Sequence, residues 1–207
     1  MDDERAFRLI IVAGFVIFAP VGVYHRLRAD SGEKLDRRQE GLFILITLRL
    51  VAVAAMAGLI TWLVNPVLMA WAAVPLPASL RWTGAALGAI AGLLLVWTFH
   101  SLGRNITDTV VTRKVHTLVT NGPYRWVRHP FYSSAALLVL ASSLVTANGF
   151  VFATGSLIFL LLMIRTRREE ENLIARFGDD YRRYMNRTGR FLPRFGRGDS
   201  PGLSCFL

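Results

Sequence analysis

The chain has 207 residues, of which 53% are hydrophobic, and its mean hydropathy is +0.42. Long apolar runs exclude most soluble classes and indicate a helical membrane protein, and the alternation typical of a membrane β-barrel is absent over any useful length. The formal net charge is +10, but the basic residues lie between or after the apolar runs. Lipid headgroups and membrane topology explain such charges better than nucleic acid does. Cys205 is the only cysteine, which excludes a disulfide within the chain and a cysteine-based metal site.

Five apolar stretches predict five membrane-spanning helices. They cover residues 6–24, 41–64, 82–99, 131–147 and 149–164. The sequence Ala147-Asn148-Gly149 is a tight-turn signal, so the last two stretches should form a helical hairpin. We therefore predict an all-α, multi-spanning integral membrane protein.

Three features between and within these stretches need interpretation. Residues 66–80 are apolar but contain prolines, so we expect them to lie at the membrane interface without crossing it. Gly84, Gly88 and Gly92 are spaced by four residues, which lets another helix approach closely, within the chain or between chains. Arg49 lies inside the second stretch, where it either lines a cavity or extends back to the interface.

Lysine and arginine are distributed very unevenly between the two sides of the membrane. The loop at 25–40, the segment 100–130 and the chain from Arg165 onward carry five, five and ten of them, whereas the opposite side carries three. The side richer in basic residues is normally the cytoplasm. We therefore expect the N-terminus outside and both the long polar connection and the C-terminal tail in the cytoplasm.

The predicted topology brings two polar segments together. Both ends of the final hairpin lie on one side of the membrane, so residues 116–132 should lie close to residues 165–184. We expect residues 165–177 to be helical and to end at Gly178. The side chains that could carry chemistry are His116, Tyr124, Arg128, His129, Tyr132, Arg165, Glu169, Glu170, Tyr181 and Tyr184.

Arg165 and Glu169 are one helical turn apart and share a face. They could pair with each other, or each could hold the oppositely charged part of a ligand. His116 and His129 have no recognised metal-site spacing, so we predict no metal. No Gly-x-Gly-x-x-Gly segment follows a strand, which argues against a soluble nucleotide-binding domain.

Three segments together resemble the isoprenylcysteine carboxyl methyltransferase family, which is related to membrane phospholipid N-methyltransferases. They are HTLVTNGPYRWVRHPFY at 116–132, REEENLIARFGDDYRRY at 168–184 and RFLP at 190–193. The specificity comes from their order: a histidine, Gly-Pro-Tyr, Arg-His-Pro-x-Tyr, Glu-Glu-x-x-Leu and Phe-Gly-x-x-Tyr. The resemblance covers about residues 100–195, whereas the first two predicted spans match no family.

The resemblance implies an integral-membrane methyltransferase that uses S-adenosylmethionine, held in a cytoplasm-facing pocket of the C-terminal half. It implies a cofactor site made by His116, Thr117, Leu118, Val119, Tyr124, His129, Pro130, Tyr132 and Glu169. Arg165 falls where the prenylcysteine enzymes place an arginine near the substrate carboxylate, and we group Arg128 with it as a catalytic residue. In physical terms Glu169 suits the ammonium of the cofactor, and His129 with nearby main-chain amides suits its carboxylate.

The sequence does not identify the methyl acceptor. The acceptor could resemble a prenylcysteine carboxylate, or it could be another lipid or a small apolar molecule. The methyl group could go to oxygen, nitrogen or sulfur, and we expect the membrane to be a bacterial inner membrane. The alternatives are an NADPH-dependent membrane reductase of the sterol-reductase type and a non-enzymatic membrane protein. We expect three units, namely membrane spans at 1–99, a methyltransferase core at 100–195 and a disordered tail at 196–207.

Overall fold

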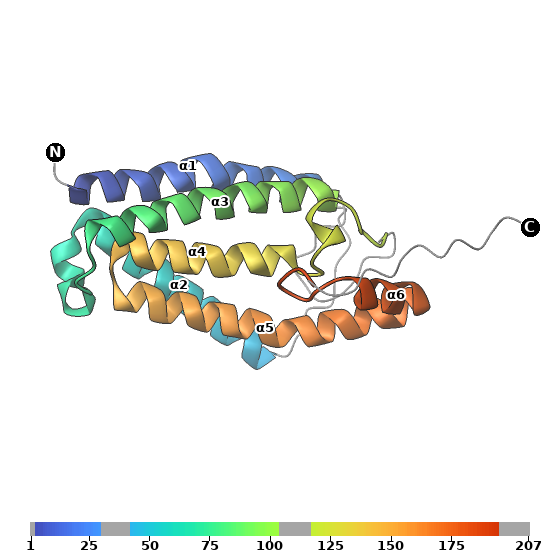
Figure 1. Cartoon of the computed structure of the whole chain (residues 1–207). Helices are drawn as coiled ribbons and strands as arrows, with labels where there is room; N and C mark the ends of the chain where they lie inside the picture. The colour runs from blue at the N-terminus through green and yellow to red at the C-terminus, as the bar shows by residue number, and fades with distance from the viewer. Residues whose placement is uncertain (1–2, 30–41, 104–116, 195–207) are drawn as a thin grey trace, which may run out of the picture.

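The computed structural model of the chain describes residues 3–29, 42–103 and 117–194, and it shows a bundle of long helices lying side by side (Figure 1). The elements in chain order are α1 (Asp3–Ala29), α2 (Leu42–Val64), η2 (Pro66–Ala72), α3 (Ala78–Leu102), η4 (Gly122–Arg125), α4 (Pro130–Thr146), α5 (Gly149–Phe177) and α6 (Asp179–Arg187). Extended pairing within the described ranges amounts to isolated bridges. The predicted all-α fold is confirmed.

The predicted spans correspond to the five long helices. Within α1, α2, α3 and α5 the described residues include stretches long and apolar enough to cross a membrane, and α4 is a shorter apolar helix of 17 residues. The multi-spanning architecture is thereby confirmed. The helix predicted at 165–177 is confirmed, and it continues the last apolar stretch without a break: α5 is one helix of 29 residues that is followed by Gly178. No glycine or proline interrupts residues 156–177, so the apolar span and its polar extension share one axis.

The expected interfacial excursion is the short helix η2. Asn65 caps it by accepting a hydrogen bond from the N–H of Val67 at 3.1 Å, and Trp71 on the same element is 72% exposed. Extended chain follows up to Pro77, which stands immediately before α3. Such a proline fixes the backbone at a helix start, so α3 begins four residues earlier than the apolar pattern predicted.

The glycines of α3 pack within the chain. A side-chain carbon on Gly84 would lie 2.6 Å from Cβ of Leu144 on α4, and one on Gly92 would collide with the ring of Phe18 on α1. α3 is therefore the central helix that holds α1 and α4, and the small residues permit both close approaches. Arg49 is exposed on the surface of α2, which favours the interface interpretation over the cavity interpretation.

The turn between α4 and α5 forms as predicted, and Asn148 organises it. Ala147 adopts a left-handed conformation with φ of 47°. The Asn148 side chain accepts hydrogen bonds from the N–H groups of Phe150 and Val151 at 3.0 and 3.2 Å, and it donates to the Met69 carbonyl at 3.1 Å. One buried side chain thus starts α5 and also ties the hairpin to η2.

Replacing Asn148 with alanine should destabilise the bundle by about 2–3 kcal/mol, because a helix cap is lost and the buried Met69 carbonyl loses its donor. Thermal unfolding in detergent, followed by circular dichroism, measures the effect. Asn65→Ala is the matched control, since Asn65 caps an exposed short helix, and it should lower the unfolding temperature much less. Equal losses in the two variants would contradict the role assigned to Asn148.

Candidate functional site

The two predicted flanks meet at one end of the bundle, which we call the polar end. Figure 1 shows η4, the start of α4, the second half of α5 and α6 gathered there. The hydroxyl of Tyr184 donates to the Tyr124 carbonyl at 2.6 Å, and the hydroxyl of Tyr132 donates to Glu169 at 2.9 Å. Residues some forty to sixty positions apart therefore touch directly, as the hairpin topology predicted.

Pro130 determines where His129 stands. It is the first residue of α4, and His129 precedes it with φ of −125° and ψ of 61°. Proline disfavours helical geometry in the residue before it, so the chain turns at this point. His129 therefore lies at the mouth of the helix, where its ring is 5.5 Å from the Tyr132 ring and 5.8 Å from the Phe191 ring.

Glu169 is the carboxylate that remains partly open. Its Oε2 accepts the hydroxyl of Tyr132 at 2.9 Å and lies 3.8 Å from Nδ1 of His129, and its side chain is 29% exposed. Arg165 stands one turn earlier on α5 and adds a positive charge that acts on this carboxyl. The Glu169 carboxylate thus has three of the predicted residues around it, namely Arg165, His129 and Tyr132.

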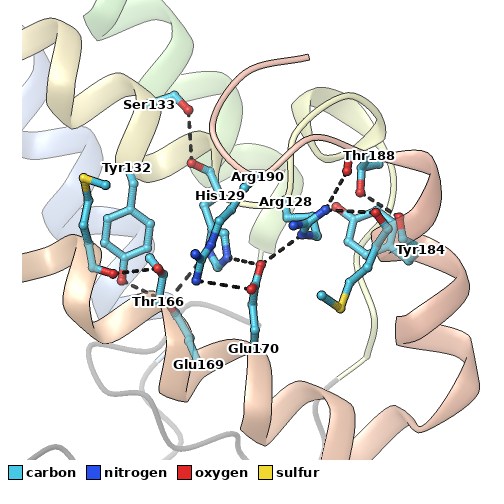
Figure 2. Close-up of polar contacts among 12 residues, drawn as sticks. Arg128, His129, Tyr132, Ser133, Thr166, Glu169, Glu170, Tyr184, Thr188 and Arg190 are labelled. Atoms are coloured by element: carbon cyan, nitrogen blue, oxygen red, sulfur yellow. Dashed lines mark hydrogen bonds and ion pairs between the residues drawn. The ribbon is translucent and has the colours of Figure 1, made fainter. Parts of the chain in front are cut away.

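Glu170 is the centre of a buried charge network (Figure 2). Its Oε1 contacts Nε of Arg128 at 3.0 Å and Nε2 of His129 at 3.1 Å, while its Oε2 contacts Nη2 of Arg190 at 3.2 Å. The Glu170 side chain is only 11% exposed. From the sequence we named Glu170 as a candidate but assigned it no specific role, and we did not name Arg190. Both residues lie in motifs that the sequence analysis identified, Glu170 in Glu-Glu-x-x-Leu and Arg190 in RFLP.

Arg128 is occupied by contacts within the protein. Besides Glu170, its guanidinium donates from Nη1 to the carbonyl oxygens of Met185 at 3.0 Å and Thr188 at 2.6 Å. These carbonyls close the C-terminal end of α6, where a positive charge is favourable. Arg128, which we had grouped with the catalytic residues, thus connects three elements of the site.

Residues 188–192 form a strap against the start of α4. The N–H of Gly189 donates to the Trp126 carbonyl at 3.0 Å, and the N–H groups of Arg128 and His129 donate to the carbonyls of Gly189 and Arg190 at 2.8 and 3.0 Å. A side chain on Gly189 would collide with the Leu192 carbonyl. The strap therefore depends on glycine at this position.

A narrow cleft opens beside this network between the segment before α4 and the end of α5. Its lining residues are Leu102, Thr117, Leu118, Val119, Tyr124, Arg128, Leu173, Phe177, Tyr181 and Tyr184. Four of the predicted cofactor residues, Thr117, Leu118, Val119 and Tyr124, line the cleft. His129, Pro130, Tyr132 and Glu169 lie in the adjoining network, and His116 lies outside the described residues.

Three tyrosines give the cleft a neutral polar wall. Burial raises the pKa of Tyr124, and the negative charge of Glu169 adds to that shift. Burial also raises the pKa of Tyr181, with a contribution from Glu170, and the pKa of Tyr184. All three hydroxyls stay protonated at neutral pH and are therefore available as hydrogen-bond donors.

Comparison with known proteins identifies the region that contains this site. Residues 85–175 match the model of the isoprenylcysteine carboxyl methyltransferase (ICMT) family. This part of the chain is therefore similar to that family. The matched region runs from α3 through most of α5, so it includes Tyr124, His129, Glu169 and Glu170, whereas the strap follows it.

Individual relatives share this region with the chain. A protein-S-isoprenylcysteine O-methyltransferase of Rattus norvegicus is 33% identical over 126 residues, covering 55% of this chain and 43% of the relative. A methanethiol S-methyltransferase of Pseudomonas deceptionensis is 38% identical over 79 residues, covering 38% of this chain and 29% of the relative. The cobalt-zinc-cadmium resistance protein CzcN of Cupriavidus metallidurans is 37% identical over 90 residues, covering 42% of each chain.

A solved structure supports the fold. The eukaryotic intramembrane Ras methyltransferase ICMT superposes with a TM-score of 0.51 at 24% identity, over 70% of this chain and 51% of that chain. The sequence matches with the three curated relatives named above each cover less than half of the relative's length. The solved structure therefore shows that the fold is shared over the matched part of the chain.

The contacts of Arg128 lead to a stability prediction. Arg128→Lys cannot reach the three acceptors of the planar guanidinium, so it should destabilise the polar end by about 2–4 kcal/mol. Arg182→Ala is the control, because within the described part of the chain the Arg182 side chain forms an exposed ion pair with Asp179 at 3.8 Å, and it should stay within about 0.5 kcal/mol of wild type. Thermal unfolding in detergent compares the two, and a wild-type melting curve for Arg128→Lys would contradict this account.

Proposed function

We propose that this chain is an integral-membrane methyltransferase that uses S-adenosylmethionine and acts on a lipophilic acceptor. The observation that carries the proposal is the position of Glu169: a partly open carboxylate bonded to Tyr132, beside a tyrosine-walled cleft, within a region of the ICMT family. Among the matches reported above, two relatives bear methyltransferase names. The membrane reductase considered from the sequence finds no support in those matches.

The charges of the site fit a cationic cofactor. S-adenosylmethionine supplies an activated methyl group on a positively charged sulfur, together with an ammonium, a carboxylate and an adenine. The Glu170 charge is offset by Arg128 and Arg190, so Glu169 is the carboxylate with capacity for a ligand cation. The aromatic walls of the cleft suit the adenine and the sulfonium through stacking and cation–π contacts.

The direction of α5 supports a lateral approach of the acceptor. The helix leaves its apolar part near Ile164, so Arg165 stands one turn nearer the bilayer than Glu169. An acceptor that arrives laterally from the lipid would meet Arg165 before it reaches a cofactor held at Glu169. Methyl transfer by in-line displacement then needs alignment and exclusion of water more than acid–base chemistry, at least for a carboxylate acceptor. An acceptor carboxylate would also pair with Arg165.

The cofactor site is tested by titrating the detergent-purified protein with S-adenosylhomocysteine in a calorimeter. Glu169→Ala and His129→Ala should each weaken binding by at least about tenfold, because each removes a charged or polar ligand contact. Glu171→Ala is the matched control, since it removes the same charge from the next exposed position on α5. Folded wild-type protein that binds no S-adenosylhomocysteine would refute the proposal.

We also propose that the polar end faces the cytoplasm, in a bacterial inner membrane, because the basic residues are concentrated on that side. The single cysteine, Cys205, makes this directly measurable with a membrane-impermeant maleimide. Labelling should occur in inverted membrane vesicles and be absent in intact cells. Cys205→Ser controls for background, and labelling of intact cells would reverse the orientation.

A further inference from the structure

The tautomer of His129 follows from its neighbours. Oε1 of Glu170 lies 3.1 Å from Nε2 of His129 and 3.0 Å from Nε of Arg128, and the other oxygen pairs with Arg190. Two guanidinium groups hold this carboxylate in its ionised form, in which it can only accept hydrogen bonds. The proton must therefore be on Nε2 of His129.

The opposite ring nitrogen of His129 faces Glu169. Nδ1 lies 3.8 Å from Oε2 of Glu169, which is too far for a hydrogen bond. In a neutral imidazole with its proton on Nε2, Nδ1 carries a lone pair and acts as an acceptor. Nδ1 and Oε2 are thus two acceptors, close enough that one ammonium nitrogen could donate to both.

We propose that Glu170 is a positioning residue: it fixes the Nε2–H tautomer of His129, so that Nδ1 and Glu169 together bind the ammonium of the cofactor. This assigns His129 to the cationic group, whereas the sequence suggested the carboxylate. The ring is buried, with only 5% of the side chain exposed, and it packs against the rings of Tyr132 and Phe191. The strap therefore also helps to position His129, because Phe191 packs against the ring and Arg190 pairs with Glu170.

The inference about ammonium binding rests on the proposed function, but the tautomer is a property of the folded chain. The two can be measured separately by nitrogen NMR of the full-length protein labelled with ¹⁵N-histidine in detergent micelles. The chain has four histidines, and His129→Gln identifies the signals of His129. We expect a protonated Nε2 and an unprotonated Nδ1.

The ligand step has its own readout. S-adenosylhomocysteine should shift the Nδ1 signal while leaving that nitrogen unprotonated, because an ammonium donates to it. Methylthioadenosine, which lacks the amino-acid group, should leave the signal in place. If Nδ1 instead becomes protonated on binding, the ring is donating to the ligand carboxylate and the proposed ammonium role is overturned.

Variants separate positioning from folding. Glu170→Gln should let the second tautomer appear and weaken S-adenosylhomocysteine binding by about tenfold to a hundredfold. Arg190→Gln removes a cation from the same carboxylate but leaves the acceptor of Nε2, so it should keep the wild-type tautomer. Glu171→Gln controls for the loss of charge.

Each outcome decides a named part of the inference. A wild-type ring protonated at Nδ1, or a folded Glu170→Gln variant with unchanged tautomer and affinity, overturns the positioning role. If Glu170→Gln fails to fold, the wild-type spectrum and the Arg190→Gln spectrum still decide the tautomer. The expected tautomer in a protein that binds no S-adenosylhomocysteine supports the positioning role and refutes the proposed function and the ammonium site.

Discussion

The Glu170 carboxylate is the interaction on which the polar end depends. A buried charge is tolerated only when nearby groups replace the water it has lost. Arg128, His129 and Arg190 do so from two different parts of the chain, while Glu170 itself belongs to α5. Removing any of these groups leaves its partners buried and incompletely compensated, so the start of α4, the middle of α5 and the strap are fixed relative to one another.

This network relies on the apolar bundle to bring its members within reach. Asn148 closes the α4–α5 turn at the far end, and α4 and α5 then return to the polar end together. Pro130 stops α4 from extending backward, which leaves His129 and Arg128 outside the helix with their side chains directed at α5. The site is thus produced by two helix boundaries and one turn, each specified by one or two residues.

The sequence predicted those features that depend on local patterns, and it did not predict those that depend on contacts between residues far apart in the chain. Helices, the hairpin and the meeting of the two flanks depend on local apolar patterns and on topology, and they were predicted. The contacts of Arg128 with the end of α6 and the strap at 188–192 depend on main-chain positions about 60 residues away in the sequence, which no local pattern encodes. The same holds for the glycines of α3: their spacing indicated close packing, but only the structure shows that Leu144 and Phe18 of this chain occupy the space.

The continuity of α5 would let the proposed site serve two ligands of opposite character. A rigid helix that extends from the apolar bundle into the polar end holds Arg165 and Glu169 at a fixed separation of one turn. A polar cofactor can then approach from the aqueous side while an apolar acceptor approaches from the bilayer, and neither has to cross the other's solvent. A break in the helix at residue 164 would have removed this constraint, because the two side chains could then move independently. The uninterrupted run of helix-forming residues through 165–177 would therefore contribute to the proposed function by fixing geometry as well as by supplying charge.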